Sequence, residues 1–140
     1  MDHVGVVVED LDAAVGFFVA LGLEEKGRHF VEGATVDRII GLEGARSELA
    51  FLQTPDGHSR LELVEFHSPP FAGARGEEPS NAPGIRHITF AVDDLDAALS
   101  AIREHGAELV GEVQSYEGSY KLCYARGPAG VIVELAERLS

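Results

Sequence analysis

The sequence predicts an α+β fold made of two copies of one βαβββ module. Residues 2–15 and 86–99 align without a gap, and seven of the fourteen positions are identical. Later in each half a Pro-x-Gly turn, at residues 55–57 and 128–130, precedes a final apolar strand. In each half the apolar pattern also changes from a period of two to a helical period and then back. A repeat this short indicates a unit that cannot bury its apolar face alone and pairs with a copy.

The first strand of each half is predicted from alternating apolar residues. Val4, Val6 and Val8 alternate with their neighbours in the first half, and residues 88–92 alternate in the same way in the second. A period of two is typical of a strand with one face against an apolar layer. We therefore expect both segments to be half-buried strands.

A helix is predicted after each of these strands. Asp10 and Asp94 are suitable N-cap residues, because a carboxylate there accepts a hydrogen bond from an N–H of the first turn. Apolar residues then recur at helical spacing, and Gly22 and Gly106 stand where a helix-ending glycine is common. Each helix should lie between its aspartate and its glycine, and in the first half the helical period stops after residue 23.

Three more strands are predicted in each half, where Gly and Pro separate short apolar runs. We expect them near residues 24–31, 47–54, 59–66, 108–113, 119–125 and 131–136. The modules then cover about 1–66 and 85–140, and a linker rich in Pro, Gly and Ala covers 67–84. A length of 140 residues fits a single domain that contains both modules.

The composition of the chain excludes some classes of binding partner. Eleven Lys and Arg against 24 Asp and Glu give a net charge of −13, which repels phosphate backbones and anionic lipids. We therefore expect neither nucleic acid nor a membrane as a partner. Cys123 is the single cysteine, and no stretch approaches the roughly 20 apolar residues that a spanning helix needs. These features indicate a soluble, cytoplasmic protein.

Four polar residues recur at matching points of the two modules. His3 and His87 occupy the same place in the first strands, and Glu62 and Glu134 the same place in the last strands. Because successive side chains of a strand point to opposite faces, all four should lie on the face away from the helices. Two imidazoles and two carboxylates suit a divalent transition-metal ion with positions left open for water or substrate.

A structural role is the more common explanation for one isolated histidine or glutamate in a strand. Here the same costly polar residue recurs at the same point of both modules, where an unpaired buried charge would cost several kcal/mol. The duplication therefore favours the metal site. The other histidines have no repeat partner, and Cys123 fits a small buried hydrophobic residue without a catalytic role.

Almost the whole chain resembles the vicinal oxygen chelate superfamily. That superfamily includes glyoxalase I, methylmalonyl-CoA epimerase, extradiol dioxygenases, and fosfomycin and bleomycin resistance proteins. The resemblance lies in the segments DHVGVVVEDLDAAVGFFVALGL, PDGHSRLELVEF, RHITFAVDDLDAAL and GPAGVIVELAE. It implies a cup-shaped mixed sheet around a cavity. It also implies one divalent metal ion (Ni, Co, Zn, Mn or Fe), with His3, Glu62, His87 and Glu134 as its ligands.

The resemblance further implies a metal-dependent lyase or isomerase of the glyoxalase I type, similar to lactoylglutathione lyase. Such an enzyme stabilises the enediolate of a small oxo or thiohemiacetal substrate. Glu62 and Glu134 are then the candidate catalytic residues, and similarity to the glyoxalase branch favours Glu134 as the base. Arg60, on the same strand face as Glu62, is a candidate to bind an anionic group of the substrate. The resemblance also implies a homodimer, with the cavity closed within one chain or between two.

Three other functions stay open at this point. The epimerase branch often has Gln at the position of Glu62. An extradiol dioxygenase would bind Fe(II) through His3, His87 and Glu134, but Glu62 would then occupy a position that dioxygen or substrate needs. Members of the bleomycin resistance type bind a small molecule without catalysis, so the fold alone does not establish an enzyme.

Overall fold

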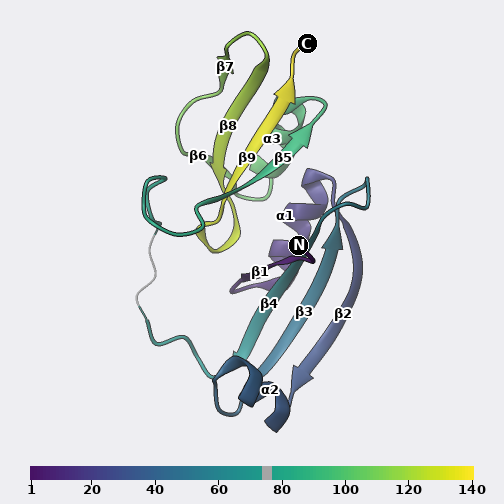
Figure 1. The fold of residues 1–140 in the computed structure, drawn as a ribbon, viewed down its shortest axis with the longest axis vertical. Coiled ribbons are helices and arrows are strands. Elements are labelled where there is room, and N and C mark those ends of the chain that lie inside the picture. Colours follow the sequence, from purple (N-terminus) through teal and green to yellow (C-terminus); the bar gives the residue numbers. More distant parts are fainter. Residues whose placement is uncertain (74–76) are drawn as a thin grey trace. The chain divides into compact units, whose positions relative to one another are not determined.

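The computed structural model describes residues 1–73 and 77–140 and shows a mixed α+β fold (Figure 1). Two compact units divide the chain, Met1–Ala74 and Arg75–Ser140, which we call module 1 and module 2. Each module has its own mixed sheet, as the sequence predicts. Among the described residues, no helix is long and apolar enough to cross a membrane.

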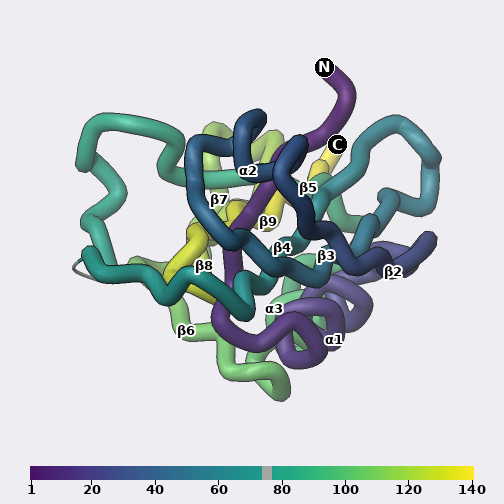
Figure 2. The backbone as a smooth tube through the Cα atoms, turned by 90° about the horizontal axis from the view of Figure 1, so that it is seen from below, coloured from purple at the N-terminus to yellow at the C-terminus, as the bar shows by residue number. Residues whose placement is uncertain are grey.

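Module 1 follows the order strand, helix and three strands, with one short helix added. Its elements are β1 (Val4–Val7), α1 (Leu11–Leu21), β2 (Glu24–Glu32), α2 (Ala34–Ile40), β3 (Arg46–Gln53) and β4 (Arg60–Ser68). The sheet order is β1-β4-β3-β2, with β1 parallel to β4 and the other neighbours antiparallel. Helix α1 covers one face of this sheet (Figure 2).

Module 2 repeats this topology. Its elements are β5 (His87–Val92), α3 (Leu95–Arg103), β6 (Glu108–Leu109), β7 (Gln114–Tyr116), β8 (Tyr120–Arg126), a 3-10 turn (Pro128–Gly130) and β9 (Ile132–Arg138). The strand order is β5-β9-β8-β6, β7 also pairs with β8, and β5 runs parallel to β9. The parallel pair of first and last strands is therefore common to both modules, and the predicted duplication is confirmed.

Two predicted segments differ from the structure. Helix α2 lies where the sequence predicts no helix. Its end is fixed by local contacts: Gly41 takes a left-handed conformation, and the Asp37 carboxylate accepts hydrogen bonds from the N–H groups of Gly44 and Ala45. No residue of α2 is buried, so an apolar period could not reveal it. The strand expected over residues 108–113 is broken. β6 and β7 pair separately with β8, and Gly111, a poor strand residue, lies between them.

The linker also differs slightly from the prediction. β4 extends to Ser68, two residues into the segment 67–84 that was expected to be linker. Residues 77–86 contain no helix or strand. The remaining linker residues 74–76 lie outside the described part of the chain.

The predicted helix starts hold in both modules, but the predicted end holds only in module 1, because α3 ends at Arg103 with Glu104 as its C-cap, before the predicted Gly106. The carboxylates of Asp10 and Asp94 accept hydrogen bonds from the N–H groups of Ala13 and Ala97, each at 3.0 Å. Gly22 ends α1 in the left-handed conformation, with φ of 118°. A second carboxylate also supports each helix start, because Leu11 N–H donates to Glu65 at 3.1 Å and Leu95 N–H donates to Glu137 at 2.7 Å.

Removal of an N-cap should destabilise the fold by a measurable amount. We expect Asp10→Ala and Asp94→Ala each to lower the free energy of unfolding by about 1 kcal/mol, since each leaves a helix N–H without its acceptor. Urea unfolding followed by circular dichroism measures the change. Asp93→Ala is the matched control at an exposed neighbouring position, and an equal loss in the control would contradict the capping role.

The core of each module lies between its helix and its sheet. In module 1, Phe17 and Phe18 of α1 and Leu63 of β4 are fully buried. In module 2, Ile102 of α3 and Leu135 of β9 are fully buried as well. Each last strand thus turns its leucines toward the helix, which leaves the alternate residues on the opposite face.

Candidate metal centre

In module 1, His3 and Glu62 lie together on the face of the sheet away from α1. Leu61 and Leu63, on either side of Glu62, are buried, whereas the Glu62 side chain keeps 24% of its surface exposed. His3 Nε2 lies 3.5 Å from Glu62 Oε2. Two donor atoms bound to one first-row metal ion at about 2.1 Å lie about 3.0 to 3.4 Å apart at ordinary ligand angles. The pair is therefore already close to the separation that a shared ion requires.

The other nitrogen of His3 is held by Asp2. His3 Nδ1 donates to Asp2 Oδ2 at 2.7 Å, and Arg60 Nη2 donates to the same oxygen at 2.7 Å. The hydrogen bond from His3, together with the Arg60 charge, lowers the pKa of the Asp2 carboxyl below its usual value. The Phe51 ring lies 5.4 Å from the imidazole, edge to face. A carboxylate on Nδ1 orients a histidine so that Nε2 is left for the metal.

In module 2, His87 and Glu134 also lie on the face away from the helix. Tyr124 Oη and His87 Nδ1 form a hydrogen bond of 3.3 Å, and their rings lie 5.0 Å apart. Thr89 Oγ1 donates to Glu134 Oε1 at 2.8 Å. Glu134 is flanked in β9 by buried Val133 and Leu135, as the alternation predicts. Glu134 therefore has a hydrogen-bond partner on the adjacent strand β5, and His87 has one on β8, on the far side of β9.

The strand registers show that Phe51 and Tyr124 occupy equivalent positions in the two modules. Phe51 pairs with Glu62 in module 1, and Tyr124 pairs with Glu134 in module 2. Sequence reasoning did not single out Tyr124 at this position. A signal was available, because Phe51 and Tyr124 each stand four residues before the proline of the Pro-x-Gly turn.

The structure groups the four predicted ligands as two pairs, one pair on each module. Within residues 1–73 and 77–140, no three His, Cys, Asp or Glu side chains gather as a metal site. Their donor chemistry nonetheless fits a divalent ion, since each module offers one imidazole and one carboxylate on a single face. Convergence of all four on one ion stays a prediction.

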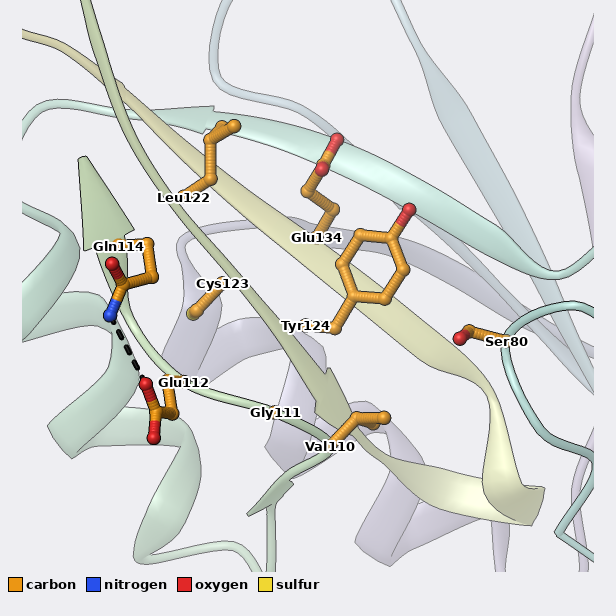
Figure 3. Close-up of a pocket in the computed structure, with 9 residues that line it drawn as sticks. All are labelled: Ser80, Val110, Gly111, Glu112, Gln114, Leu122, Cys123, Tyr124 and Glu134. Atoms are coloured by element: carbon orange, nitrogen blue, oxygen red, sulfur yellow. Dashed lines mark hydrogen bonds between the residues drawn. The ribbon is translucent and has the colours of Figure 1, made fainter. Parts of the chain in front are cut away.

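A groove of about 280 Å³ opens on module 2 beside Glu134 (Figure 3). Leu122, Tyr124 and Glu134 project to the same side of β8 and β9, whereas Cys123 points the other way. The groove also receives Ser80 and residues 110–114 of the β6–β7 connection. Apolar surface next to a carboxylate is suited to a small organic molecule with a polar reacting end.

Arg60 has a carboxylate partner and an aromatic partner within module 1. Arg60 bonds Asp2, lies over the Phe51 ring at 5.6 Å, and keeps 41% of its side chain exposed. Its charge is thus partly compensated within module 1, and its predicted contact with an anionic substrate stays a prediction.

Cys123 is 3% exposed, and burial raises the pKa of its thiol. The prediction that it is a small buried residue is confirmed.

Comparison with known proteins establishes the family. The sequence model of the family described as the Glyoxalase/Bleomycin resistance protein/Dioxygenase superfamily matches residues 2–124. The chain belongs to this superfamily. The resemblance drawn from the four sequence segments is therefore confirmed, and the superfamily includes enzymes such as glyoxalase I.

Individual relatives of this superfamily member agree on the fold. A glyoxalase family protein of Bacillus cereus is 48% identical, with a TM-score of 0.94 over 100% of this chain and 94% of that one. A variant of glyoxalase I from Zea mays has a TM-score of 0.68 at 19% identity, over 100% of this chain and 45% of that one, which shows the fold alone. Uncharacterized protein YaeR of Escherichia coli is 32% identical over 59% of this chain, and the match spans 61% of YaeR.

Proposed function

We propose that this protein is a metal-dependent lyase or isomerase of the glyoxalase I type that acts on a small oxo or thiohemiacetal substrate. The observation that carries the proposal is the repeated His and Glu pair on the face of each sheet away from its helix. In module 1 the donor atoms of that pair are 3.5 Å apart, close to the spacing for one shared ion. Superfamily membership supports the proposal, because members commonly bind a divalent metal.

His3, Glu62, His87 and Glu134 would hold the ion. When bound, a divalent ion supplies Lewis acidity that stabilises negative charge on substrate oxygens. Two carboxylate ligands neutralise the ion, and one of them is available to accept the proton that leaves the substrate carbon. The groove beside Glu134 accepts the organic part of the substrate, next to the reacting end.

The pair His3 and Glu62 and the pair His87 and Glu134 must meet on one ion for this chemistry, either within one chain or between the chains of a homodimer. We propose the homodimer as the working state, in the cytoplasm. In either arrangement each complete site contains one pair from a module 1 and one pair from a module 2. Metal stoichiometry together with sedimentation equilibrium tests this, since one ion per chain is expected in both arrangements and the mass identifies the dimer.

Metal removal tests the proposal directly. Untreated protein is analysed for elements, stripped with EDTA, and reloaded with Ni, Co, Zn, Mn or Fe. We expect reloading to stabilise the fold by about 2.7 kcal/mol when free metal is 100 times its Kd, because the metal binds only the folded state. Activity is followed with the hemithioacetal of methylglyoxal and glutathione, and solvent deuterium incorporation reports the proton transfer.

The same samples separate the other functions. Oxygen consumption with a catechol in the Fe(II)-loaded protein would favour the dioxygenase. Ligand binding that is unchanged by metal removal would favour a binding protein of the bleomycin resistance type. Absence of any metal-dependent stabilisation in all five metals would contradict the proposed metal site.

A further inference from the structure

The segment that precedes β5 forms one side of the groove of module 2. Residues 77–82 belong to this module, and Ser80 lines the groove together with Tyr124. The Pro79 carbonyl accepts a hydrogen bond from the Ala82 N–H at 3.0 Å, which closes a turn with Ser80 at its corner. Figure 3 shows the Ser80 hydroxyl pointing from this turn toward Tyr124. We call residues 77–82 the linker wall.

Arg126 fastens the linker wall to the sheet. It is the last residue of β8, and its side chain is 14% exposed. Its Nη2 donates a hydrogen bond to the Glu78 carbonyl, and its Nε lies 3.5 Å from Glu77 Oε2. Its Nη1 donates to the Gly130 carbonyl at 3.1 Å, in the turn before β9. One guanidinium thus joins the linker wall to the β8–β9 turn through all three of its nitrogens.

The repeat indicates that the turn itself does not need Arg126. The equivalent residue of module 1 is Gln53, since each of the two stands two residues before the proline of its Pro-x-Gly turn. In module 1 the pairing of β3 with β4 continues to Gln53, so the strands and the turn form without an arginine. The contacts of Arg126 with Glu77 and Glu78 therefore indicate a separate role, which is to hold the linker wall.

The groove offers apolar surface and an available hydroxyl. Leu122 and Val110 line it, and its volume of about 280 Å³ lies near the lower end of the roughly 300 to 1,000 Å³ of ligand pockets. Among the described residues, none forms a hydrogen bond with the Ser80 hydroxyl, which leaves it for a ligand. These features suit a small organic group with one polar end.

The charges of the groove disfavour an anion. Glu112 and Glu134 line it, and they accept hydrogen bonds from the uncharged side chains of Gln114 at 3.2 Å and Thr89 at 2.8 Å. In the part of the chain that the structure describes, no Lys, Arg or His lines the groove, and the Arg126 guanidinium is directed at the linker wall. A ligand carboxylate would therefore lose water without gaining a cation.

We propose that Arg126 is a positioning residue that holds the linker wall at the groove, and that Ser80 binds the polar end of an organic group that carries no negative charge. The inference rests on the proposed function, which places the organic part of the substrate in this groove, and it names the class of that part. Arg126 acts without touching the ligand. Its planar fork reaches two carbonyls at once, which the single ammonium of a lysine does not reproduce.

Three probes of similar shape and different charge test the ligand class: benzyl alcohol, benzylamine and benzoate. The full chain is treated with EDTA, so that benzoate cannot bind a metal ion. An NMR titration follows the backbone N–H signals of Gly111, Leu122 and Tyr124, which lie at the groove. We expect benzyl alcohol and benzylamine to shift these signals, and benzoate to leave them in place at the same concentrations.

Four variants test the two residues. Ser80→Ala should weaken the affinity for benzyl alcohol about fivefold, as loss of one hydrogen bond does. Arg126→Gln, which copies the residue of module 1, should weaken it at least as much and lower the heteronuclear NOE of the Ser80 N–H, because the linker wall becomes mobile. Arg126→Lys should behave as Arg126→Gln does. Asn81→Ala is the matched control, since Asn81 shares the turn but does not line the groove.

Each result supports or contradicts one step. Groove signals that respond to no probe, or equally to benzoate and benzyl alcohol, would show that the ligand class is wrong. Unweakened binding in Ser80→Ala would exclude the contact with Ser80. An unchanged NOE and affinity in Arg126→Gln would exclude the positioning role, and so would failure of that variant to fold in urea unfolding experiments, since Arg126 would then be needed for the fold itself.

These measurements require neither metal nor turnover. The inference can therefore fail while metal reloading still stabilises the protein, which would leave the proposed function standing. Conversely, absence of metal-dependent stabilisation together with the expected probe binding would overturn the proposed function and keep the groove, Ser80 and Arg126 as a binding site.

Discussion

Glu134→Gln is expected to slow proton transfer by about 10²- to 10⁴-fold, because Glu134 is the proposed base. An amide oxygen can still ligate an ion, but an amide cannot accept the substrate proton as a carboxylate does. The measurement combines metal content per chain with the rate of deuterium incorporation into the hemithioacetal. Glu62→Gln, in contrast, should keep most of the exchange rate per bound metal ion, because the proposed base Glu134 is unchanged.

Glu43→Gln is the matched control, since Glu43 is exposed and lies outside the sheets. Its metal content and exchange rate should equal those of the unaltered protein. A near-normal rate in Glu134→Gln with full metal content would exclude Glu134 as the base. Loss of exchange in Glu62→Gln with full metal content would assign that role to Glu62.

Phe18→Ala is expected to lower the free energy of unfolding by about 3 to 5 kcal/mol. Phe18 is fully buried between α1 and the sheet of module 1, so its removal loses apolar burial and leaves a cavity. That loss is a large part of the roughly 5 to 15 kcal/mol by which domains are stable. Urea unfolding followed by circular dichroism measures it.

Val19→Ala is the control for this prediction, because Val19 follows Phe18 in α1 but is 46% exposed. A cost below about 1 kcal/mol is expected for the control. Equal costs for the two variants would show that α1 does not pack as the structure indicates. Ile102→Ala, in α3, makes the corresponding test in module 2.

Much of the fold could be predicted because the chain presents each signal twice. The caps at Asp10 and Asp94 and the alternating first strands recur in both halves, so each copy supports the interpretation of the other. Helix α2 has no copy and buries no residue, and its end depends on hydrogen bonds to Asp37 that no apolar pattern encodes. The break between β6 and β7 likewise reflects a local departure from the ladder at Gly111.

The candidate site was predictable only as far as alternation allows. Alternation placed His3, Glu62 and Glu134 on the face away from the helices, and the structure agrees. Alternation says nothing about which neighbours touch them, because that depends on the pairing register of strands distant in sequence. Thr89 and Tyr124 therefore emerged only from the strand registers of module 2.

The two glutamates of each last strand also disfavour an incorrect strand register. Glu62 lies on the face of β4 away from α1, and Glu65, three residues later, faces α1 and accepts a hydrogen bond from the start of that helix. Glu137 follows Glu134 in β9 with the same spacing and bonds the start of α3. A slip of one residue would turn each strand over, bury Glu62 or Glu134 beneath the helix and leave the helix start without its acceptor. Such a slip would cost stability in two ways, so the hydrogen bond to the helix start also fixes the side of the sheet on which Glu62 and Glu134 lie.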